Sequence, residues 1–215
     1  MLKLVGLLGG TFNPIHFGHL RMAQELATNL HLDEVRFIPS ANPPHKSLPK
    51  VSAQHRARMV QLAIADNPLF DCDTQELTRK GASYTIDTLI SLREELGNAV
   101  SICLMMGSDA FMYLNTWHRW QELLNYCHII LVQRPNNLTK KIQLPEELQR
   151  FLQENYTEDS HDLSQNKAGY IHMQKITAHE ISSTTIRHQL NLGQKPFYLM
   201  PANVIDYINE NSLYI

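Results

Sequence analysis

Short apolar runs alternate along the chain with longer segments in which apolar residues recur at helical spacing. Residues 4–8, 35–38, 100–106 and 129–132 have the length and composition of buried strands. Between these runs, residues 20–30, 57–65 and 85–96 gather their apolar side chains on one helical face. Strands that alternate with helices indicate a parallel sheet covered on both faces. We therefore expect an α/β fold with a doubly wound, mainly parallel, Rossmann-like sheet.

Three segments depart from this alternation. Residues 39–50 contain four prolines and end on a lysine, which indicates a functional loop rather than a tight turn. Residues 154–169 are polar and almost without pattern, so we expect them to be mobile. Residues 201–214 are predicted as a helix with Pro201 in its first turn. Because no repeat or linker divides the chain, we expect a single domain over residues 1–215.

Composition narrows the class of protein. Hydrophobic residues make up 43% and charged residues 19% of the 215 residues, as in ordinary globular proteins. The formal charge of −2 gives no general attraction to nucleic acid, so a site for a polyanion must be built locally. The odd set Cys72, Cys103 and Cys127 argues against a disulfide framework. With no apolar stretch of about 18 residues and no signal cleavage site, we expect a cytoplasmic protein without membrane contact.

The first strand runs directly into the sequence GGTFNPIHFGHL, residues 9–20. Gly9 and Gly10 allow the backbone to approach a ligand closely, and Gly18 does so where the next helix begins. His16 and His19 are spaced to face a phosphate together from that helix start. The alternative is that the two histidines have only structural roles, one as a helix cap and the other as a surface residue. A metal pair would need a third ligand and a helical glutamate, and a Walker motif would need Gly-Lys-Ser/Thr, all of which the sequence lacks.

A second group of anion-binding residues lies at ISSTTIR, residues 181–187. Ser182, Ser183 and Thr184 offer hydroxyls at a helix start, and Arg187 lies one turn beyond Ser183. Helix initiation alone explains one such hydroxyl. A run of hydroxyls followed by an arginine indicates a site for β- and γ-phosphates.

Other polar residues follow the predicted strands. Asp109, shortly after Gly107, is placed to take a ribose hydroxyl, although it would serve equally as a helix cap. Arg134 follows the strand at 129–132 and is either at the crevice edge or merely exposed. In the proline-rich loop, His45 and Lys46 are placed to hold a substrate phosphate, and a solvated lysine is the alternative.

The two end motifs together resemble the H-x-G-H nucleotidyltransferase superfamily, which includes adenylyltransferases and cytidylyltransferases. The resemblance implies that His16, His19 and Arg187 act in catalysis on the triphosphate of ATP, with Mg²⁺ carried by its phosphates. It also implies that the helical part from about residue 180 completes the ATP site. The residues implied to bind ATP are Gly9, Gly10, Thr11, Phe12, Gly18, His19, Gly107, Asp109, Arg134, Ser182, Ser183, Thr184 and Arg187.

The middle motifs NPPHK, ASYT, GSD, TW and LVQRP occur in an order similar to that of the bacterial nicotinate mononucleotide adenylyltransferases, which make deamido-NAD in NAD biosynthesis. This resemblance implies that Trp117 stacks on the pyridine ring and that backbone amides near Thr85 and around Trp117 and His118 bind the carboxylate. Asn13, His45 and Lys46 are the further acceptor-binding residues that it implies. Residues 154–169 match nothing in this pattern.

The resemblance implies that the acceptor phosphate attacks the α-phosphorus of ATP in line and needs no side-chain nucleophile. Two alternatives remain. One is an enzyme that uses another acceptor, such as phosphopantetheine, or cytidine triphosphate as the donor. Trp117 and the proline-rich loop argue against this alternative. The other is a nucleotide-binding sensor without turnover. The presence of His16, Gly18, His19 and Arg187 argues against it. The sequence leaves the oligomeric state open.

Overall fold

The protein is described by a computed structural model that covers residues 1–42, 49–79, 81–133, 144–177 and 181–215. Its seven strands form one parallel sheet in the order β3-β2-β1-β4-β5-β7-β6. The order reverses between β1 and β4, which places a ligand crevice at their carboxyl ends. The strands are β1 (Lys3–Gly10), β2 (Glu34–Pro39), β3 (Phe70–Cys72), β4 (Val100–Gly107), β5 (His128–Gln133), β6 (Tyr156–Thr157) and β7 (Ile171–Lys175).

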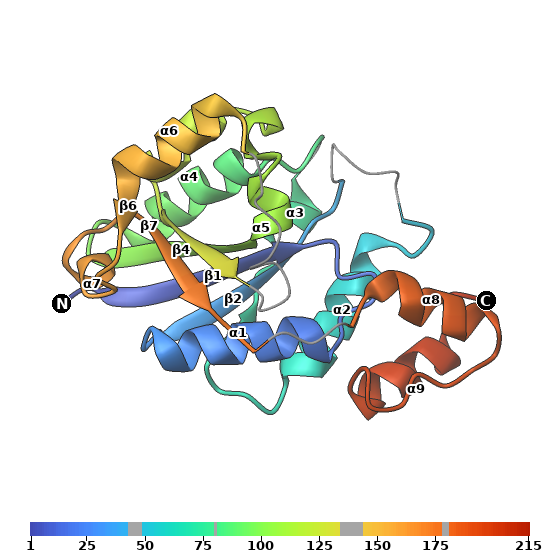
Figure 1. Ribbon diagram of the computed structural model, residues 1–215. Coiled ribbons are helices and arrows are strands. Elements are labelled where there is room, and N and C mark those ends of the chain that lie inside the picture. Colours follow the sequence, from blue (N-terminus) through green and yellow to red (C-terminus); the bar gives the residue numbers. More distant parts are fainter. Residues whose placement is uncertain (43–48, 80, 134–143, 178–180) are drawn as a thin grey trace.

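Helices cover both faces of this sheet, with α1 and α2 on one side and α4 and α6 on the other (Figure 1). Two 3₁₀ helices, η1 and η2, follow α5 beyond β4. The helices are α1 (Phe17–Asn29), α2 (Ala53–Ile64), α3 (Gln75–Thr78), α4 (Thr85–Leu96), α5 (Ser108–Phe111), η1 (Leu114–Thr116), η2 (Trp120–Asn125), α6 (Glu146–Asn155), α7 (Asp162–Gln165), α8 (Ser183–Asn191) and α9 (Ala202–Glu210).

Strand β1 shows why the sheet needs two covering layers. Leu4 and Leu8 join the hydrophobic cluster that contains α1 and α2, while Val5 and Leu7 join the cluster on the α4 side. Successive side chains of a strand point to opposite faces, so an uninterrupted apolar run is buried only when both faces are packed. The predicted α/β fold with a doubly wound parallel sheet is confirmed.

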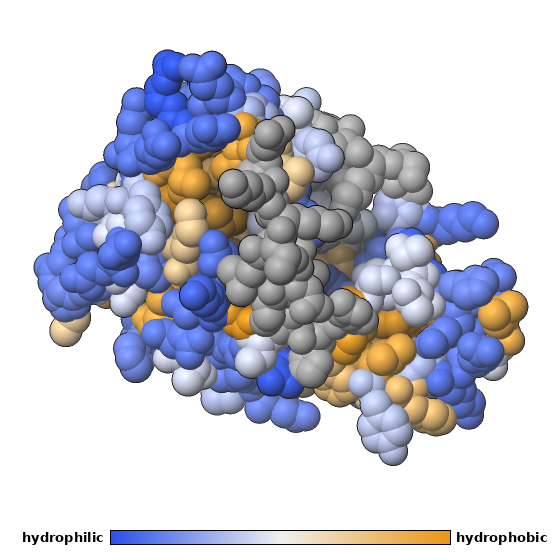
Figure 2. Space-filling model, viewed as in Figure 1, coloured by the Kyte–Doolittle hydropathy of each residue, from blue (hydrophilic) through white to orange (hydrophobic). Residues whose placement is uncertain are grey.

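Helices α8 and α9 lie beyond the carboxyl ends of the strands (Figure 1). Helix α9 packs on α2, where the Tyr207 hydroxyl and His55 Nδ1 are 2.8 Å apart and Asn203 Nδ2 donates to the Leu62 carbonyl at 2.8 Å. Figure 2 shows apolar side chains near the two C-terminal helices on the face turned toward the viewer. The predicted helix over residues 201–214 is shorter than expected, because α9 ends at Glu210 and Pro201 serves as its N-cap.

The prediction of a mobile segment at residues 154–169 is wrong. This segment contains the end of α6, strand β6 and helix α7, and it buries Thr157 and Leu163 completely or nearly so. The Ser164 carbonyl accepts a hydrogen bond from the Leu2 amide at 2.8 Å, which fixes α7 beside the start of β1. A two-residue strand and a single helical turn carry too few apolar residues to show a pattern in sequence.

None of the helices in the ranges described above is both long enough and apolar enough to cross a membrane.

Candidate active site

The loop after β1 leads into the start of α1, where two imidazole rings lie together. The ring centroids of His16 and His19 are 3.8 Å apart and the ring planes differ by 24°. The ring of Phe12, which is buried, forms a T-shaped contact with the ring of His19, and the centroids are 5.2 Å apart. His16 is the N-cap residue of α1 and is itself buried. The buried Phe12 ring therefore supports the histidine pair from the side of the core, at the N-terminus of α1.

Gly18 lies against His16 at the first turn of α1. A Cβ atom at Gly18 would lie 2.9 Å from His16 Nδ1 and 3.0 Å from His16 Cε1. Cβ atoms in real proteins essentially never come within 3.0 Å of such a neighbour, so a side chain here would displace the imidazole. The close approach of the His16 ring therefore requires glycine at this position.

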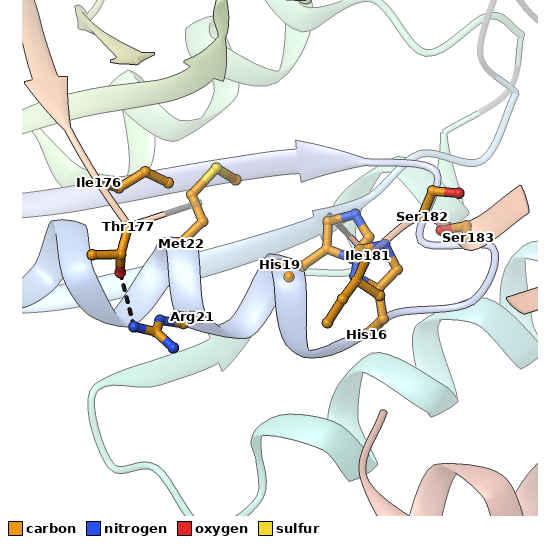
Figure 3. A pocket seen from close by; sticks show the side chains of 10 residues that line it. His16, His19, Arg21, Met22, Ile176, Thr177, Ile181, Ser182 and Ser183 are labelled. Atoms are coloured by element: carbon orange, nitrogen blue, oxygen red, sulfur yellow. Dashed lines mark hydrogen bonds between the residues drawn. The ribbon is translucent and has the colours of Figure 1, made fainter. Parts of the chain in front are cut away.

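Helix α8 begins across a small pocket from this pair (Figure 3). The Ser182 hydroxyl accepts a hydrogen bond from the Thr185 amide at 3.1 Å and caps the helix, and the Ser183 hydroxyl donates to the Pro14 carbonyl at 2.9 Å. The pocket has a volume of about 250 Å³ and is lined by His16, Gly18, His19, Arg21, Met22, Ile176, Thr177, Ile181, Ser182 and Ser183.

The starts of two helices therefore meet at one pocket. Neither α1 nor α8 has an acidic residue in its first turn, so no carboxylate of either turn competes for the helix N-terminus. Free N–H groups and the helix dipole attract anions at such ends. Hydroxyls and imidazoles add donors around the same space. The arrangement suits a chain of phosphate groups.

Arg187 joins α8 to the loop after β1. Its Nη1 donates to the Asn13 carbonyl at 2.8 Å, and its Nη2 donates to Thr184 Oγ1 at 3.2 Å. The guanidinium thus connects the two segments predicted to bind phosphate, residues 9–20 and 181–187, although they are far apart in the sequence.

A larger cavity of about 740 Å³ opens where β1 and β4 end. One part is lined by the loop residues Gly9, Gly10, Thr11 and His19 together with Gly107 and Asp109, which follow β4. The other part is lined by aromatic and helix-start residues, among them Tyr84, Thr85, Trp117 and His118. The rings of Tyr84 and His118 contact each other with centroids 4.5 Å apart. Trp117 is half-buried here, whereas Trp120 and Phe111 belong to the core.

The backbone around the aromatic part offers hydrogen-bond donors. Among the described residues, no acceptor is found for the amides of Thr85 and Ile86 at the start of α4 or for the amide of His118. The Trp117 amide already donates to the Leu114 carbonyl at 2.9 Å. The donor near the tryptophan is therefore the His118 amide.

Arg56 was missed by sequence reasoning. It is only 1% exposed, and its Nη1 donates to the Thr11 carbonyl at 2.6 Å while its Nη2 donates to the Ser40 carbonyl at 2.7 Å. It thereby joins the ends of β1 and β2. Burial lowers the pKa of Arg56, and nearby Tyr214 opposes this shift. The available signal was an arginine on the same helical face as Met59 and Val60, where a core residue is expected.

Glu76 was missed as well. It lines the large cavity, is buried, and accepts a hydrogen bond from Thr88 Oγ1 at 2.8 Å. Burial raises the pKa of this carboxyl, against hydrogen bonds from Thr88 and Ser83. A four-residue helix such as α3 gives no periodic pattern from which a buried carboxyl could be recognised.

Three predicted site residues, His45, Lys46 and Arg134, lie outside the described residues. Most of the others line one of the two cavities, and the side chain of Phe12 packs into the core beneath His19. Asn13, Thr184 and Arg187 line neither cavity, but Arg187 contacts both Asn13 and Thr184. In the described part of the chain, no group of three or more His, Cys, Asp or Glu side chains is arranged to hold a metal ion.

Comparison with known proteins gives the family. Residues 7–189 match the cytidylyltransferase-like family. A relative from Aeromonas salmonicida, named "probable nicotinate-nucleotide adenylyltransferase", is 45% identical over 100% of this chain and 99% of its own length. A relative of the same name from Methylococcus capsulatus is 41% identical over 98% and 99%.

The fold is also found among solved structures. The nicotinic acid mononucleotide adenylyltransferase of Plasmodium falciparum, solved in complex with NaAD, superposes with a TM-score of 0.71 at 19% identity and covers 99% of this chain and 97% of its own. Its identity is low, so this likeness supports the Rossmann-like fold alone. The family match and the full-length relatives together show that the chain is an enzyme of the cytidylyltransferase-like family and belongs to the nicotinate-nucleotide adenylyltransferases.

Proposed function

We propose that this chain transfers the adenylyl group of ATP to nicotinate mononucleotide and releases pyrophosphate and deamido-NAD. The single observation that carries this proposal is the 740 Å³ cavity, in which a glycine-lined end and an aromatic end are continuous. An adenylyltransferase must hold a nucleotide and an acceptor side by side. The relatives and their names support the same reaction.

ATP occupies the glycine-lined end in this proposal. Its triphosphate extends between the starts of α1 and α8, where the pocket contains His16, His19 and Ser183. Asp109 takes a ribose hydroxyl. The helical part from about residue 180 completes this half of the site, because Ser183 and Arg187 are bonded to the loop after β1.

The acceptor occupies the aromatic end. Its pyridine ring stacks on Trp117, and its carboxylate accepts hydrogen bonds from the amides of Thr85 and His118. In this proposal the acceptor phosphate is bound by Asn13, His45 and Lys46, and the last two are assigned by family resemblance alone.

The reaction is a single displacement. An oxygen of the acceptor phosphate attacks the α-phosphorus of ATP, and the bond from that phosphorus to the oxygen bridging to the β-phosphate breaks. The attacking oxygen is already anionic, so no general base is needed, and pyrophosphate leaves with the electron pair of the broken bond. His16, His19 and Arg187 act by holding the phosphates in line and by donating toward the charge that develops on them.

Mg²⁺ is proposed to accompany ATP and to neutralise charge on its phosphates. The donor set around the triphosphate pocket consists of imidazoles, hydroxyls and helix N-termini rather than carboxylates. Such a set fits an ion held mainly by phosphate oxygens and water, not an all-protein cage.

The test is pyrophosphate release from Mg-ATP across a panel of phosphorylated acceptors. Nicotinate mononucleotide should be used at least about tenfold more efficiently, in kcat/KM, than nicotinamide mononucleotide. The amide must turn its own NH₂ toward one of the backbone donors, and a hydrogen bond to a charged group contributes about 1.5–3 kcal/mol. Trp117→Ala should raise the KM of both acceptors, since stacking does not distinguish them.

Other outcomes of the panel are equally informative. Equal efficiency with the amide, or a preference for phosphopantetheine, would remove the acceptor assignment and leave adenylyl transfer intact. Binding of ATP without pyrophosphate release for any acceptor would favour the sensor.

A further inference from the structure

A tyrosine far from the loop after β1 in sequence makes a direct contact with it. The hydroxyl of Tyr214 donates to Asn13 Oδ1 at 2.8 Å, across a separation of 201 residues. The backbone of Tyr214 has φ 68°, in the left-handed region that residues with a Cβ atom rarely adopt. A backbone held in this region persists where surrounding contacts fix it, so the hydroxyl is held at the loop rather than reaching it by chance.

The surroundings of Tyr214 make it a donor. Burial raises the pKa of the Tyr214 hydroxyl, with Arg56 and Arg187 opposing the shift, so the hydroxyl keeps its proton at neutral pH. The same two arginines bind the loop backbone on either side: Arg56 donates to the Thr11 carbonyl and Arg187 to the Asn13 carbonyl. The three contacts hold the segment from Thr11 to Asn13 from the side of α2 and the C-terminal helices.

The contact also decides which way the Asn13 amide faces. A primary amide accepts through its oxygen and donates through its nitrogen. Because Tyr214 occupies Oδ1, the two N–H groups on Nδ2 face elsewhere, and no acceptor for them is found in the described ranges. Asn13 belongs to the loop after β1, two residues after Thr11, which lines the large cavity, and an amide nitrogen in that loop is a donor suited to a phosphate oxygen.

We propose that Tyr214 is a positioning residue of the active site, which holds the Asn13 side chain so that its NH₂ group faces the acceptor phosphate. This inference rests on the proposed function for the identity of that acceptor. Tyr214 itself does not touch the reacting atoms, and its effect passes through Asn13.

The experiment is a double-mutant cycle with Tyr214→Phe, Asn13→Ala and the combined variant. Tyr207→Phe is the matched control, because its hydroxyl is also hydrogen-bonded and lies in the same C-terminal region, but its partner is His55 on α2. For each protein, KM for the acceptor, KM for ATP, kcat and Tm are measured. Tyr214→Phe should raise the acceptor KM roughly two- to tenfold, the range of one ordinary hydrogen bond, and leave the ATP KM unchanged. Tyr207→Phe should leave both KM values unchanged.

The cycle separates positioning from general stability. If Tyr214 acts through Asn13, its substitution has no further effect on the acceptor KM once Asn13 is alanine. Equal and additive effects in both backgrounds, or a lower Tm with unchanged acceptor KM, would overturn the proposal. Failure of the proposed function would appear in the wild type as use of a different phosphorylated acceptor. The cycle is then run with that acceptor, where the same coupling is expected.

Discussion

The stacked imidazoles of His16 and His19 illustrate how single residues are placed for chemistry by their neighbours. His16 is the N-cap residue of α1, Gly18 leaves room for its ring, and Phe12 supports the second ring from the core. Each ring nitrogen that faces the pocket is therefore held in position before any ligand arrives. Preorganised donors of this kind stabilise developing charge without a reorganisation cost during the reaction.

The first prediction concerns His19. His19→Ala should lower kcat by roughly a hundredfold and change the acceptor KM little, because it removes one donor to the developing charge. His188→Ala, which removes an exposed histidine at the other end of α8, is the control and should retain full activity. Steady-state kinetics with Mg-ATP checks both, and an unchanged kcat for the first variant would exclude His19 from the mechanism.

The second prediction tests the packing of Gly18. In Gly18→Ala the new methyl group would lie 2.9 Å from His16 Nδ1, so the imidazole must move. We expect kcat to fall at least about tenfold, since small displacements of catalytic groups have large effects on rate. Gly107→Ala is a control for folding, because its added methyl meets no protein atom within 4 Å, and its Tm should equal that of the wild type. Full activity of Gly18→Ala would show that His16 need not occupy its present position.

At the scale of elements, helix α4 runs from the aromatic end of the cavity toward the amino end of β4. Its start at Thr85 lines the cavity, and near its end the Arg93 guanidinium donates to four carbonyls, those of Gly97, Val100, Tyr126 and Lys167. These carbonyls belong to the C-cap of α4, the first residue of β4, the C-cap of η2 and the segment before β7. One side chain thus fixes the helix relative to several neighbours.

The third prediction follows from this contact. Arg93→Met leaves four carbonyls without their donor, and we expect a loss of roughly 3 kcal/mol in the free energy of unfolding, equivalent to a Tm lower by about 6–12 °C. Arg93→Lys should recover only part, because its single ammonium nitrogen cannot reach all four carbonyls that the two Nη atoms of the guanidinium contact. Calorimetry measures the Tm. Acceptor KM should change little below the transition, and a Tm within about 1 °C of the wild type would contradict the assignment.

The elements that sequence reasoning found and missed differ in a physical way. Strands β1, β2, β4 and β5 were predicted within two residues at each end, because a strand buried on both faces is apolar throughout. Strand β7 reads Ile-His-Met-Gln-Lys and was missed, since its pairing with β5 rather than its composition makes it a strand. Among site residues, those in continuous motifs could be predicted from the sequence. Arg56, Glu76 and Tyr214 were missed because their roles arise from tertiary contacts alone.

At the scale of the whole molecule, His128 couples folding to pH. It is completely buried; its Nε2 donates to the Asn166 carbonyl at 2.8 Å, and its Nδ1 accepts from the Tyr170 amide at 3.0 Å. Protonation would place a second N–H against the Tyr170 amide. Burial lowers the pKa of His128, against the hydrogen bond to Asn166.

The fourth prediction is the resulting pH dependence. The folded protein prefers neutral His128, so its contribution is fully present above the ordinary histidine pKa of about 6.5. It is lost as pH falls through that value toward the lower folded pKa. Urea unfolding at pH 7.5 and 5.5 should show this loss in the wild type and a smaller one in His128→Gln. His31→Asn, which replaces an exposed histidine, should behave like the wild type. A wild-type stability that does not fall over this interval would contradict the argument.

The contacts that join the loop after β1 to the C-terminal helices also determine when the site can form. They connect residues separated by 169, 174 and 201 positions, so closing them costs more chain entropy than any local pairing. We expect the sheet and its first helices to form earlier in refolding and the catalytic geometry to form last. In a stopped-flow refolding experiment, far-UV circular dichroism should recover before the capacity for pyrophosphate release. Simultaneous recovery would show that the two ends of the chain associate with the folding nucleus itself. Enzymatic activity in this protein is therefore a sensitive report on the completion of folding, because a chain that has folded everywhere except at this junction has its sheet but no active site.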